Sequence, residues 1–421
     1  MNIRKFILPI SIFFISSCSS FENPLEDLSK NTNTLTTDMA YSNYITPSEA
    51  DSIAISALTN IYANNKSRFI RAITPKQTYI YGFPKSRSIT NDTTFYVVNF
   101  APEGFALVAA DRRIKNPIYA FSDKGSFDNP SENPGQNFYM KVMKADIDAE
   151  CANTTSLPDL PVDPDTPPHP GGFQPSDPSE GAIIDFGGTK CYVKNHYDYD
   201  EVEPMVYTQW HQGMPYNTYC VDRNGKAGDT GCTAIAIAQI LSYHKSQVPN
   251  GSREYNWDAM LASPTSHGLS PEAIDDIAHL TYTVGTLANI DYKSGSSATS
   301  YNNAFKAIKD LGFTAQQIRN WDSSILTSLK EDGPIFMCGK ESKNSGHSWV
   351  VDGYKLLRTT TDYYRFEDDM KFYTTTDDTI YLRINWGSQT VNPTYYRQAS
   401  SYEVNGHNYT FDIAYIIKIK K

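Results

Sequence analysis

The spacing of apolar residues along the chain predicts two folded regions. From residue 50 to 61 apolar side chains recur at helical intervals, with Thr46 as a candidate cap and Pro47 in the first turn. Glu49 stands where it can close a capping box with Thr46. Three runs typical of β-strands follow, the last two joined by a hairpin connection, and they span 77–81, 94–100 and 104–110. The pattern predicts a small α+β domain over residues 45–151.

The stretch 152–182 interrupts this pattern. Prolines and aspartates dominate it, which is typical of a stiff, exposed linker that proteases can reach. Beyond it, residues 183–421 show helical periodicity first and strand-like alternation afterwards. The expected helices are 231–247, 271–287, 300–311 and 323–331, and the expected strands are 334–339, 347–354, 362–366, 379–386 and 412–420. A helical lobe followed by an antiparallel sheet is an α+β arrangement.

The N-terminus reads as an export signal. Arg4 and Lys5 precede an apolar run of about ten residues, which is too short to span a bilayer. The run ends in Ile15-Ser16-Ser17-Cys18, which resembles the cleavage site of a bacterial lipoprotein. We therefore expect a signal peptide at 1–17, a lipid-modified Cys18 and a polar tether at 18–44. The expected location is a bacterial membrane, at the outer membrane or cell surface, or free after processing. An ordinary secretory signal with an incidental cysteine is the alternative.

Composition excludes several classes of protein. With 40% hydrophobic and 13% aromatic residues, the 421-residue chain can bury real cores and is not largely disordered. A formal net charge of −10 gives no chain-wide basic footprint for nucleic acid. Six cysteines are too few for a disulfide scaffold at this length. The histidines form no HExxH motif and the Cys/His spacing matches no zinc site, so we expect no metal and no cofactor.

Cys232 is the first candidate for chemistry. The run 231–241 is apolar on nearly every side, which predicts a buried helix with Cys232 in its first turn. The helix dipole and the free N–H groups there favour a thiolate, and a thiolate at the mouth of a buried helix suits a nucleophile. A small buried core cysteine is the alternative, so the assignment needs partners elsewhere in the chain.

His347 is the candidate base. It follows Gly346, where the absence of a side chain lets a substrate backbone approach closely. Alternation along the predicted strand puts His347, Trp349 and Val351 on one face. Asp352 falls on the other face and is a poor candidate to orient the imidazole. Alone, His347 is more typical of a satisfied surface or core histidine than of a catalytic base.

Two further segments could complete a nucleophilic site. Asn385 could hold the second nitrogen of the imidazole, and Trp386 could shield that bond from water. The two residues point to opposite faces of a regular strand, so both reaching the histidine requires a bend at Gly387. Gln212 lies 20 residues before the candidate nucleophile and could donate to an oxyanion beside the backbone N–H of that cysteine.

The ordered combination of these segments resembles the streptopain family of papain-like cysteine peptidases, which includes interpain-like enzymes. The matching motifs are Gln212-Gly213-x-Pro215-Tyr216-Asn217, Gly231-Cys232-(x)6-Gln239-Ile240-(x)2-Tyr243-His244, Gly346-His347-(x)2-Val350-x-Asp352-Gly353 and Asn385-Trp386-Gly387. The resemblance covers 186–421, and residues 45–150 resemble the inhibitory pro-domain of this family. One departure is the continuation after Gly387, where the family has another Trp and more glycines and this chain has Ser388-Gln389-Thr390. The shape of the substrate rim is therefore not carried over.

The resemblance implies a papain-like catalytic domain of two lobes at 183–421, made as a zymogen behind a small α+β pro-domain at 45–151. By it, Cys232 is the nucleophile and His347 the general base and acid. Gln212 lies at the oxyanion hole, and Asn385 and Trp386 complete the surroundings of the histidine. The residues implied to line the substrate cleft are Gly346, Ser296 and Ser297.

The implied activity is endopeptidase cleavage of protein or peptide substrates, with the pro-domain as an intramolecular inhibitor. Two alternatives use the same sequence features: acyl transfer to an amine by the same dyad, and a surface-anchored binding protein whose peptidase domain has decayed. Four cysteines remain unassigned, and they could pair in three ways. We expect mostly free, buried thiols, because Cys338 stands in an apolar run; the four are Cys151, Cys191, Cys220 and Cys338.

Overall fold

The structure is a computed structural model. It describes residues 43–62, 74–83, 92–127, 133–153, 184–186, 189–249, 251, 253–295, 297–342, 345–388, 392–398 and 412–421. Cys18, the predicted signal and nearly all of the predicted tether and linker lie outside these residues. Among the described helices, none has the length and apolar character needed to cross a membrane.

The first region begins with α1 (Pro47–Ile61), which starts as the sequence predicts. The hydroxyl of Thr46 accepts the Glu49 N–H at 3.3 Å, and the Glu49 carboxylate accepts the Thr46 N–H at 2.6 Å, so the capping box is confirmed. Four antiparallel strands follow: β1 (Thr74–Phe83), β2 (Asp92–Ala101), β3 (Phe105–Ala109) and β4 (Ile118–Ser122). The hairpin predicted at 101–103 is the β2–β3 connection.

A second helix, α2 (Pro134–Asn153), was not predicted and enters the first two residues of the expected linker. Alternate residues of β2 divide between two cores. Tyr96 and Val98 pack with α1, whereas Phe95 and Val97 pack with α2 on the other face of the sheet. The apolar residues of α2 are spread around the helix because it is buried from more than one side, and so it shows no single amphipathic stripe.

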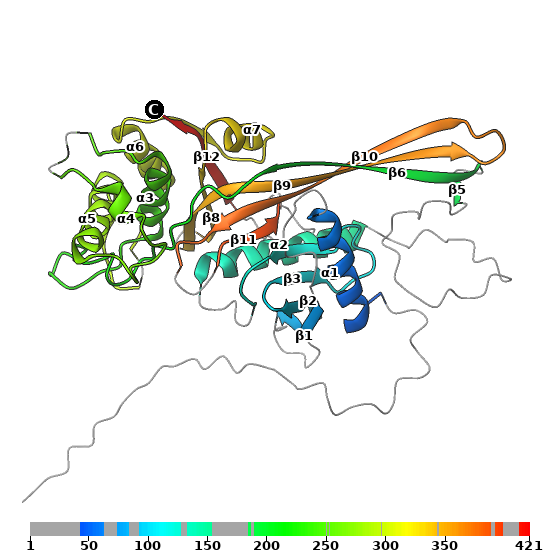
Figure 1. Cartoon of the computed structure of the whole chain (residues 1–421), viewed down its shortest axis with the longest axis horizontal. Helices are drawn as coiled ribbons and strands as arrows, with labels where there is room; N and C mark the ends of the chain where they lie inside the picture. Colours follow the sequence, from blue (N-terminus) through cyan, green and yellow to red (C-terminus); the bar gives the residue numbers. More distant parts are fainter. Residues whose placement is uncertain are drawn as a thin grey trace, which may run out of the picture. The chain divides into compact units, whose positions relative to one another are not determined.

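The second region contains the predicted helical lobe and sheet (Figure 1). The helices are α3 (Cys232–His244), α4 (Trp257–Met260), α5 (Pro271–Leu287), α6 (Tyr301–Asp310) and α7 (Ser324–Glu331). The strands are β7 (Thr314–Ile318), β8 (Ile335–Ser342), β9 (Ser345–Arg365), β10 (Lys371–Asn385), β11 (Thr394–Arg397) and β12 (Asp412–Lys420). Because these strands pair antiparallel beside a helical lobe, the predicted α+β class is confirmed.

One sheet runs through both regions, in the order β1-β2-β3-β4-β11-β10-β9-β8-β12-β7. The junction is the pair β4–β11, with Tyr395 opposite Phe121 and Tyr396 opposite Ala120. On one face of this sheet α1 and α3 each pack over their own strands, and α2 packs on the other face. The first region is therefore joined to the second by backbone pairing as well as by side chains.

The strands expected at 347–354 and 362–366 are a single long strand, β9, and β10 is likewise longer than predicted. Both extend into an arm, on which β6 (Thr189–Val202) pairs with β9 from Cys191 to Val202; β5 (Ile184–Phe186) adds a short pair at the end. Figure 1 shows the arm reaching away from the helices. Charged and threonine side chains are frequent on both faces of the arm, so the sequence shows no core-facing alternation there.

Candidate active site

Cys232 is the first residue of α3, as predicted, and it is half-buried. The preceding Gly231 has φ +89°, a conformation that L-residues rarely adopt. A Cβ at Gly231 would meet Ile290 Cδ1 at 3.2 Å and the Ser297 carbonyl oxygen at 3.4 Å. The loop at Ser297 therefore closes directly over the start of α3, and only glycine allows this approach.

The thiol of Cys232 is surrounded mainly by protein atoms. Burial raises its pKa, while hydrogen bonds from the backbone N–H and hydroxyl groups of Ser348 and Thr233 act in the opposite direction without overcoming burial. The N–H of Thr233 in the first turn of α3 does favour the thiolate, but burial is the larger effect in this conformation. In the full chain the sulfur is a protonated thiol at neutral pH.

The neighbour of Cys232 on the sheet is Ser348, not His347. The Ser348 hydroxyl lies 3.1 Å from Thr233 Oγ1, and Val350 on the same face of β9 packs into the core around α3. Trp349 packs on the opposite face, with α2. Because side chains alternate along β9, His347 shares the face of Trp349. The candidate base and the candidate nucleophile thus lie on opposite faces of the strand in this conformation.

His347 is half-buried, and burial lowers the pKa of its imidazole, which favours the neutral ring. Its partner across the ladder is Gly339 of β8. A Cβ at Gly339 would collide with the ring of Phe138 from α2, and the same ring lies 6.0 Å from that of Trp349. Helix α2 therefore covers the face of the sheet on which His347 lies.

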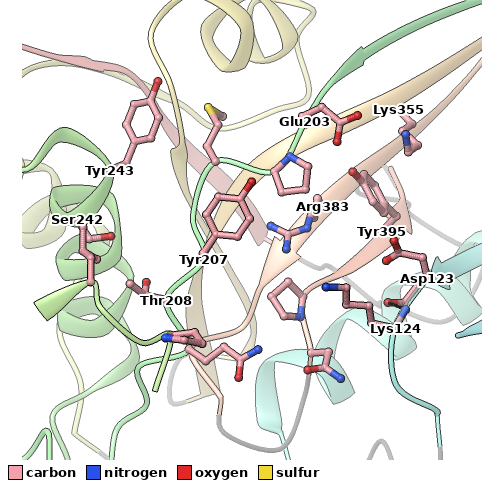
Figure 2. Close-up of a pocket in the computed structure, with 18 of the residues that line it drawn as sticks. Asp123, Lys124, Glu203, Tyr207, Thr208, Ser242, Tyr243, Lys355, Arg383 and Tyr395 are labelled. Atoms are coloured by element: carbon pink, nitrogen blue, oxygen red, sulfur yellow. Dashed lines mark hydrogen bonds between the residues drawn. The ribbon is translucent and has the colours of Figure 1, made fainter. Parts of the chain in front are cut away.

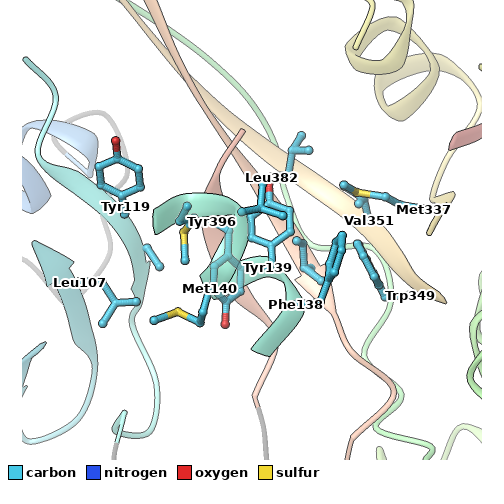
Figure 3. Close-up of a cluster of buried hydrophobic side chains, with 14 of the residues drawn as sticks. Leu107, Tyr119, Phe138, Tyr139, Met140, Met337, Trp349, Val351, Leu382 and Tyr396 are labelled. Atoms are coloured by element: carbon cyan, nitrogen blue, oxygen red, sulfur yellow. The ribbon is translucent and has the colours of Figure 1, made fainter. Parts of the chain in front are cut away.

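Figure 3 shows how α2 lies between the two regions: Phe138, Tyr139 and Met140 lie between Leu107 and Tyr119 on one side and the sheet of the second region on the other. Tyr139 contacts Trp386 edge-on with ring centroids 6.1 Å apart, and Trp386 lies 5.0 Å from Trp349. At the start of α2 a Cβ on Gly135 would meet Trp386 Cε3 at 2.9 Å. The contact between helix and sheet is close enough that it needs glycine at two positions.

Asn385 and Trp386 point to opposite faces of β10, as the alternation predicts. Asn385 is buried against α3, where its amide donates to the Thr208 carbonyl at 2.8 Å and accepts from the Gln239 side chain at 3.3 Å and the Gly387 N–H at 3.1 Å. These hydrogen bonds engage the Asn385 amide on the face of the sheet that packs against α3. Its role toward His347 stays a prediction.

The remaining predicted residues are placed as follows. Gln212 is half-buried, and its carbonyl accepts the N–H and the hydroxyl of Thr230, at 2.9 and 3.1 Å. These bonds hold Gln212 beside the turn that leads to Cys232. Ser297 is buried, and its hydroxyl closes its own loop by bonds to the N–H and carbonyl of Lys293, at 2.8 and 2.9 Å. Gly346 is exposed next to His347, and Ser296 lies outside the described residues.

Sequence reasoning missed three polar neighbours of Cys232: Thr233, Ser348 and Cys338. The signal was present, because the alternation that puts His347 on one face of β9 puts Ser348 on the other. Cys338 is opposite Ser348 in the β8–β9 register. All five described cysteines are free thiols, which agrees with the expectation of unpaired cysteines.

A cavity of about 830 Å³ lies away from this site, between Ser242 and Tyr243 in the last turn of α3 and Asp123 and Lys124 after β4 (Figure 2). Its lining includes Arg383, which pairs with the buried Asp352 at 2.5 Å, and Lys355, which pairs with Glu201 and lies 5.0 Å from the Tyr62 ring. None of the predicted catalytic residues lines it. Among the described residues, no three His, Cys, Asp or Glu side chains are grouped so that they could hold a metal ion.

Comparison with known proteins identifies the families of the two regions. Residues 210–396 match the model of the peptidase C10 family, and residues 42–147 match that of the Spi protease inhibitor. The thiol protease/hemagglutinin PrtT of Porphyromonas gingivalis is 26% identical over 63% of this chain and 32% of its own length. Streptopain of Streptococcus pyogenes is 25% identical over 62% of this chain and 68% of its own length. This chain thus spans about a third of the length of the first relative.

A solved structure of a prointerpain A fragment from Prevotella intermedia covers 82% of this chain and 99% of that fragment. Its TM-score is 0.53 and its sequence identity 17%, so it supports the fold. The two family matches fall on either side of the proline-rich stretch, and the peptidase match contains Cys232, His347 and Asn385. Residues 210–396 therefore form a peptidase domain of the C10 family of cysteine peptidases, and residues 42–147 ahead of it match the Spi protease inhibitor.

Proposed function

We propose that this protein is an exported cysteine endopeptidase, made as a zymogen, that hydrolyses peptide bonds through Cys232 and His347. One observation carries the proposal: α2 of the inhibitor domain packs on the face of β9 that carries His347, while Cys232 lies at the start of α3 on the other face. An inhibitor domain that keeps His347 away from Cys232 accounts for the match to a protease inhibitor. It also leaves the Cys232 thiol without a base to take its proton.

Activation then proceeds by cleavage within residues 152–182 and departure of residues 45–151. Once α2 leaves the sheet, the start of β9 is free to rearrange and bring the imidazole within hydrogen-bond reach of the thiol. A base at that distance removes the proton from Cys232 and produces the nucleophile that the buried thiol of the zymogen lacks.

In the active form the Cys232 thiolate attacks the substrate carbonyl, and the developing oxyanion is met by the Cys232 backbone N–H and the Gln212 side chain. His347 protonates the leaving amine, and the acyl-enzyme forms. The same imidazole then takes a proton from water, whose attack on the thioester releases the acid and restores the thiol. Gly346 and the loop of Ser296 and Ser297 line the cleft in this proposal.

Residues 1–17 act as the signal peptide in the same proposal, and a lipid on Cys18 holds the protein at a bacterial membrane. The basis is the order of a charged region, an apolar run of about ten residues and a small-residue cleavage site. Metabolic labelling with a fatty acid tests this part: the wild-type protein is expected to take the label and Cys18→Ala to lose it.

The catalytic proposal is tested with the purified protein after cleavage in the linker, on unfolded casein. The wild type is expected to cleave casein, and Cys232→Ala and His347→Ala to reduce the rate to background. Gln212→Ala should retain activity lowered by about a hundredfold or more, because one oxyanion donor contributes about 3 kcal/mol.

Cys191→Ala is the matched control, since Cys191 lies on β6 of the arm and the variant should cleave as the wild type does. Equal cleavage by the wild type and Cys232→Ala would contradict the proposal. Product masses separate hydrolysis from acyl transfer, because only transfer attaches an amine to the new C-terminus.

A further inference from the structure

A second thiol lies at the site of Cys232. Cys338 is directly opposite Ser348 in the antiparallel β8–β9 pair. Residues opposite one another have Cβ atoms about 5 Å apart and point to the same face. Ser348 in turn hydrogen-bonds the Cys232 thiol and contacts the Thr233 hydroxyl at 3.1 Å. One serine therefore stands beside both cysteines.

The packing places Cys338 on the helical side of the sheet. Its side chain packs against the core around α3, together with Phe336 and Val350. Helix α3 packs directly on both β8 and β9. The first turn of α3 and the middle of β8 thus face each other, and a disulfide between them requires the two Cα atoms to come within about 7 Å.

The Cys338 sulfur lies within electrostatic range of the Cys232 sulfur. Burial raises the pKa of the Cys338 thiol to about 12, and the charge on Cys232 is the next cause of that rise. At neutral pH Cys338 is therefore a thiol that does not compete with Cys232 for electrophiles. To attack a sulfenic acid on Cys232, the Cys338 thiol has to give up its proton, so this step is expected to become faster as the pH rises.

The other free thiols of the described chain lie elsewhere. Cys151 is on α2 and Cys191 on β6. Cys220 is buried near the turn before α3, but its thiol hydrogen-bonds Thr230 and Tyr292, and burial raises its pKa to about 11. Cys220 is thus a comparable buried thiol that lacks the shared neighbour Ser348.

We propose that Cys338 is a resolving thiol that converts oxidised Cys232 into a reversible Cys232–Cys338 disulfide. A peroxide is the oxidant: the Cys232 thiolate attacks one peroxide oxygen, the O–O bond breaks, and Cys232 becomes a sulfenic acid while the leaving oxygen takes up a proton and departs as water. The Cys338 sulfur then attacks the Cys232 sulfur, loses its proton and expels the sulfenic oxygen as a second water.

The disulfide blocks Cys232 until two thiols of a reductant reverse it. Without Cys338, the sulfenic acid is open to a second peroxide and to the irreversible sulfinic acid. The loss of peptidase activity in the disulfide form rests on the proposed function, but formation of the bond itself does not.

The test uses the full chain at alkaline pH, about 9 or above, because the raised pKa of Cys232 leaves little thiolate at pH 7. The chain is treated with hydrogen peroxide and then with an alkylating agent, and is mapped by peptide mass before and after dithiothreitol. In the wild type we expect a linked peptide pair containing Cys232 and Cys338, and full recovery of the Cys232 thiol by dithiothreitol. Cys338→Ser should give no linked pair, and its Cys232 should accumulate as sulfinic acid that dithiothreitol does not reverse. Cys220→Ser should behave as the wild type does.

Absence of the linked pair in the folded wild type, or equal recovery of Cys232 in Cys338→Ser, would overturn the proposal. Circular dichroism checks that each variant is folded, and Cys338→Ala serves as a second variant if the serine disturbs the core. Because the readout is the mass of the Cys232 peptide, the experiment gives an answer on the disulfide even if the protein cleaves no casein. A failure of the proposed peptidase function can therefore be told apart from a failure of the disulfide proposal.

Discussion

At the scale of single residues, two opposing effects act on the sulfur of Cys232. The N–H groups at the start of α3 and the Ser348 and Thr233 groups favour the thiolate, whereas burial favours the neutral thiol, and burial is the larger effect. The chain thus carries its candidate nucleophile in an unreactive form. The reactive form requires either a base or a less enclosed sulfur, and both depend on removing the inhibitor domain.

The consequence is a pH dependence of alkylation. With the pKa of Cys232 raised above 9, the thiolate fraction is small at pH 7 and grows as the pH rises through 9 and beyond. We expect iodoacetamide to modify Cys232 in the full chain much more slowly at pH 7 than it modifies a free cysteine, with a rate still increasing at pH 9. Peptide mapping against time gives the rate. A rate that levels off below pH 8 would contradict the raised pKa.

At the scale of elements, α2 is the helix that links inhibitor and peptidase. It packs on β2 and β3 of its own region and, through Phe138, on the bare backbone of Gly339 and the ring of Trp349. The same helix therefore contributes to the core of the inhibitor domain and to the cover over His347. A mutation of a side chain that covers the face of His347 can therefore be compared with a mutation of one that lies only in the core of the inhibitor domain.

Phe138→Ala is the corresponding prediction. Truncating a buried Phe costs about 3–5 kcal/mol, and here part of that cost falls on the contact between the inhibitor domain and the peptidase. We expect the variant zymogen to mature faster and its inhibitor domain to bind more weakly. Leu58→Ala in α1 is the control, because Leu58 is also buried but lies in the core on the other face of the sheet.

Gel analysis over time measures maturation, and thermal unfolding measures stability. If Leu58→Ala and Phe138→Ala speed maturation equally at matched stability, the contact of Phe138 with Gly339 has no special role. If Phe138→Ala matures faster than Leu58→Ala at matched stability, the contact of Phe138 with Gly339 itself slows maturation.

The elements also show what the sequence could and could not predict. Thr46, Pro47 and Glu49 mark the start of α1 because capping is a local interaction, and the alternation around His347 gives its face for the same reason. Helix α2 was missed because side chains of both regions bury it from more than one side, which removes its amphipathic stripe. Strand β6 was missed because neither face of the arm is a core. The neighbours of Cys232 depend on the register of β8 against β9, which no local pattern in the chain specifies.

At the scale of the whole molecule, inhibitor and peptidase share one sheet and one set of buried side chains. The backbone junction is short, since β4 and β11 are paired only at Phe121–Tyr395 and Ala120–Tyr396 within the described strands. Gln136 of α2 adds a side-chain bond to the Tyr396 hydroxyl at 2.9 Å. Most of the association therefore depends on side-chain packing, which a separate inhibitor domain can make again.

We accordingly expect the domain 45–151, added in trans to the cleaved enzyme, to inhibit casein hydrolysis in a saturable manner. The domain carrying Phe138→Ala should inhibit at higher concentration only, because it lacks the ring against Gly339. Initial rates over a concentration series measure both. No inhibition by the folded wild-type domain would contradict the proposed zymogen.

The pairing of β4 with β11 has one more consequence. In the full chain β11 is an interior strand with neighbours on both sides. When the inhibitor domain leaves, one side of β11 loses its partner, and its N–H and C=O groups become an open sheet edge. Maturation therefore creates a new edge strand on the enzyme. Since β11 has only four residues, Thr394–Arg397, it offers little length for pairing with another chain.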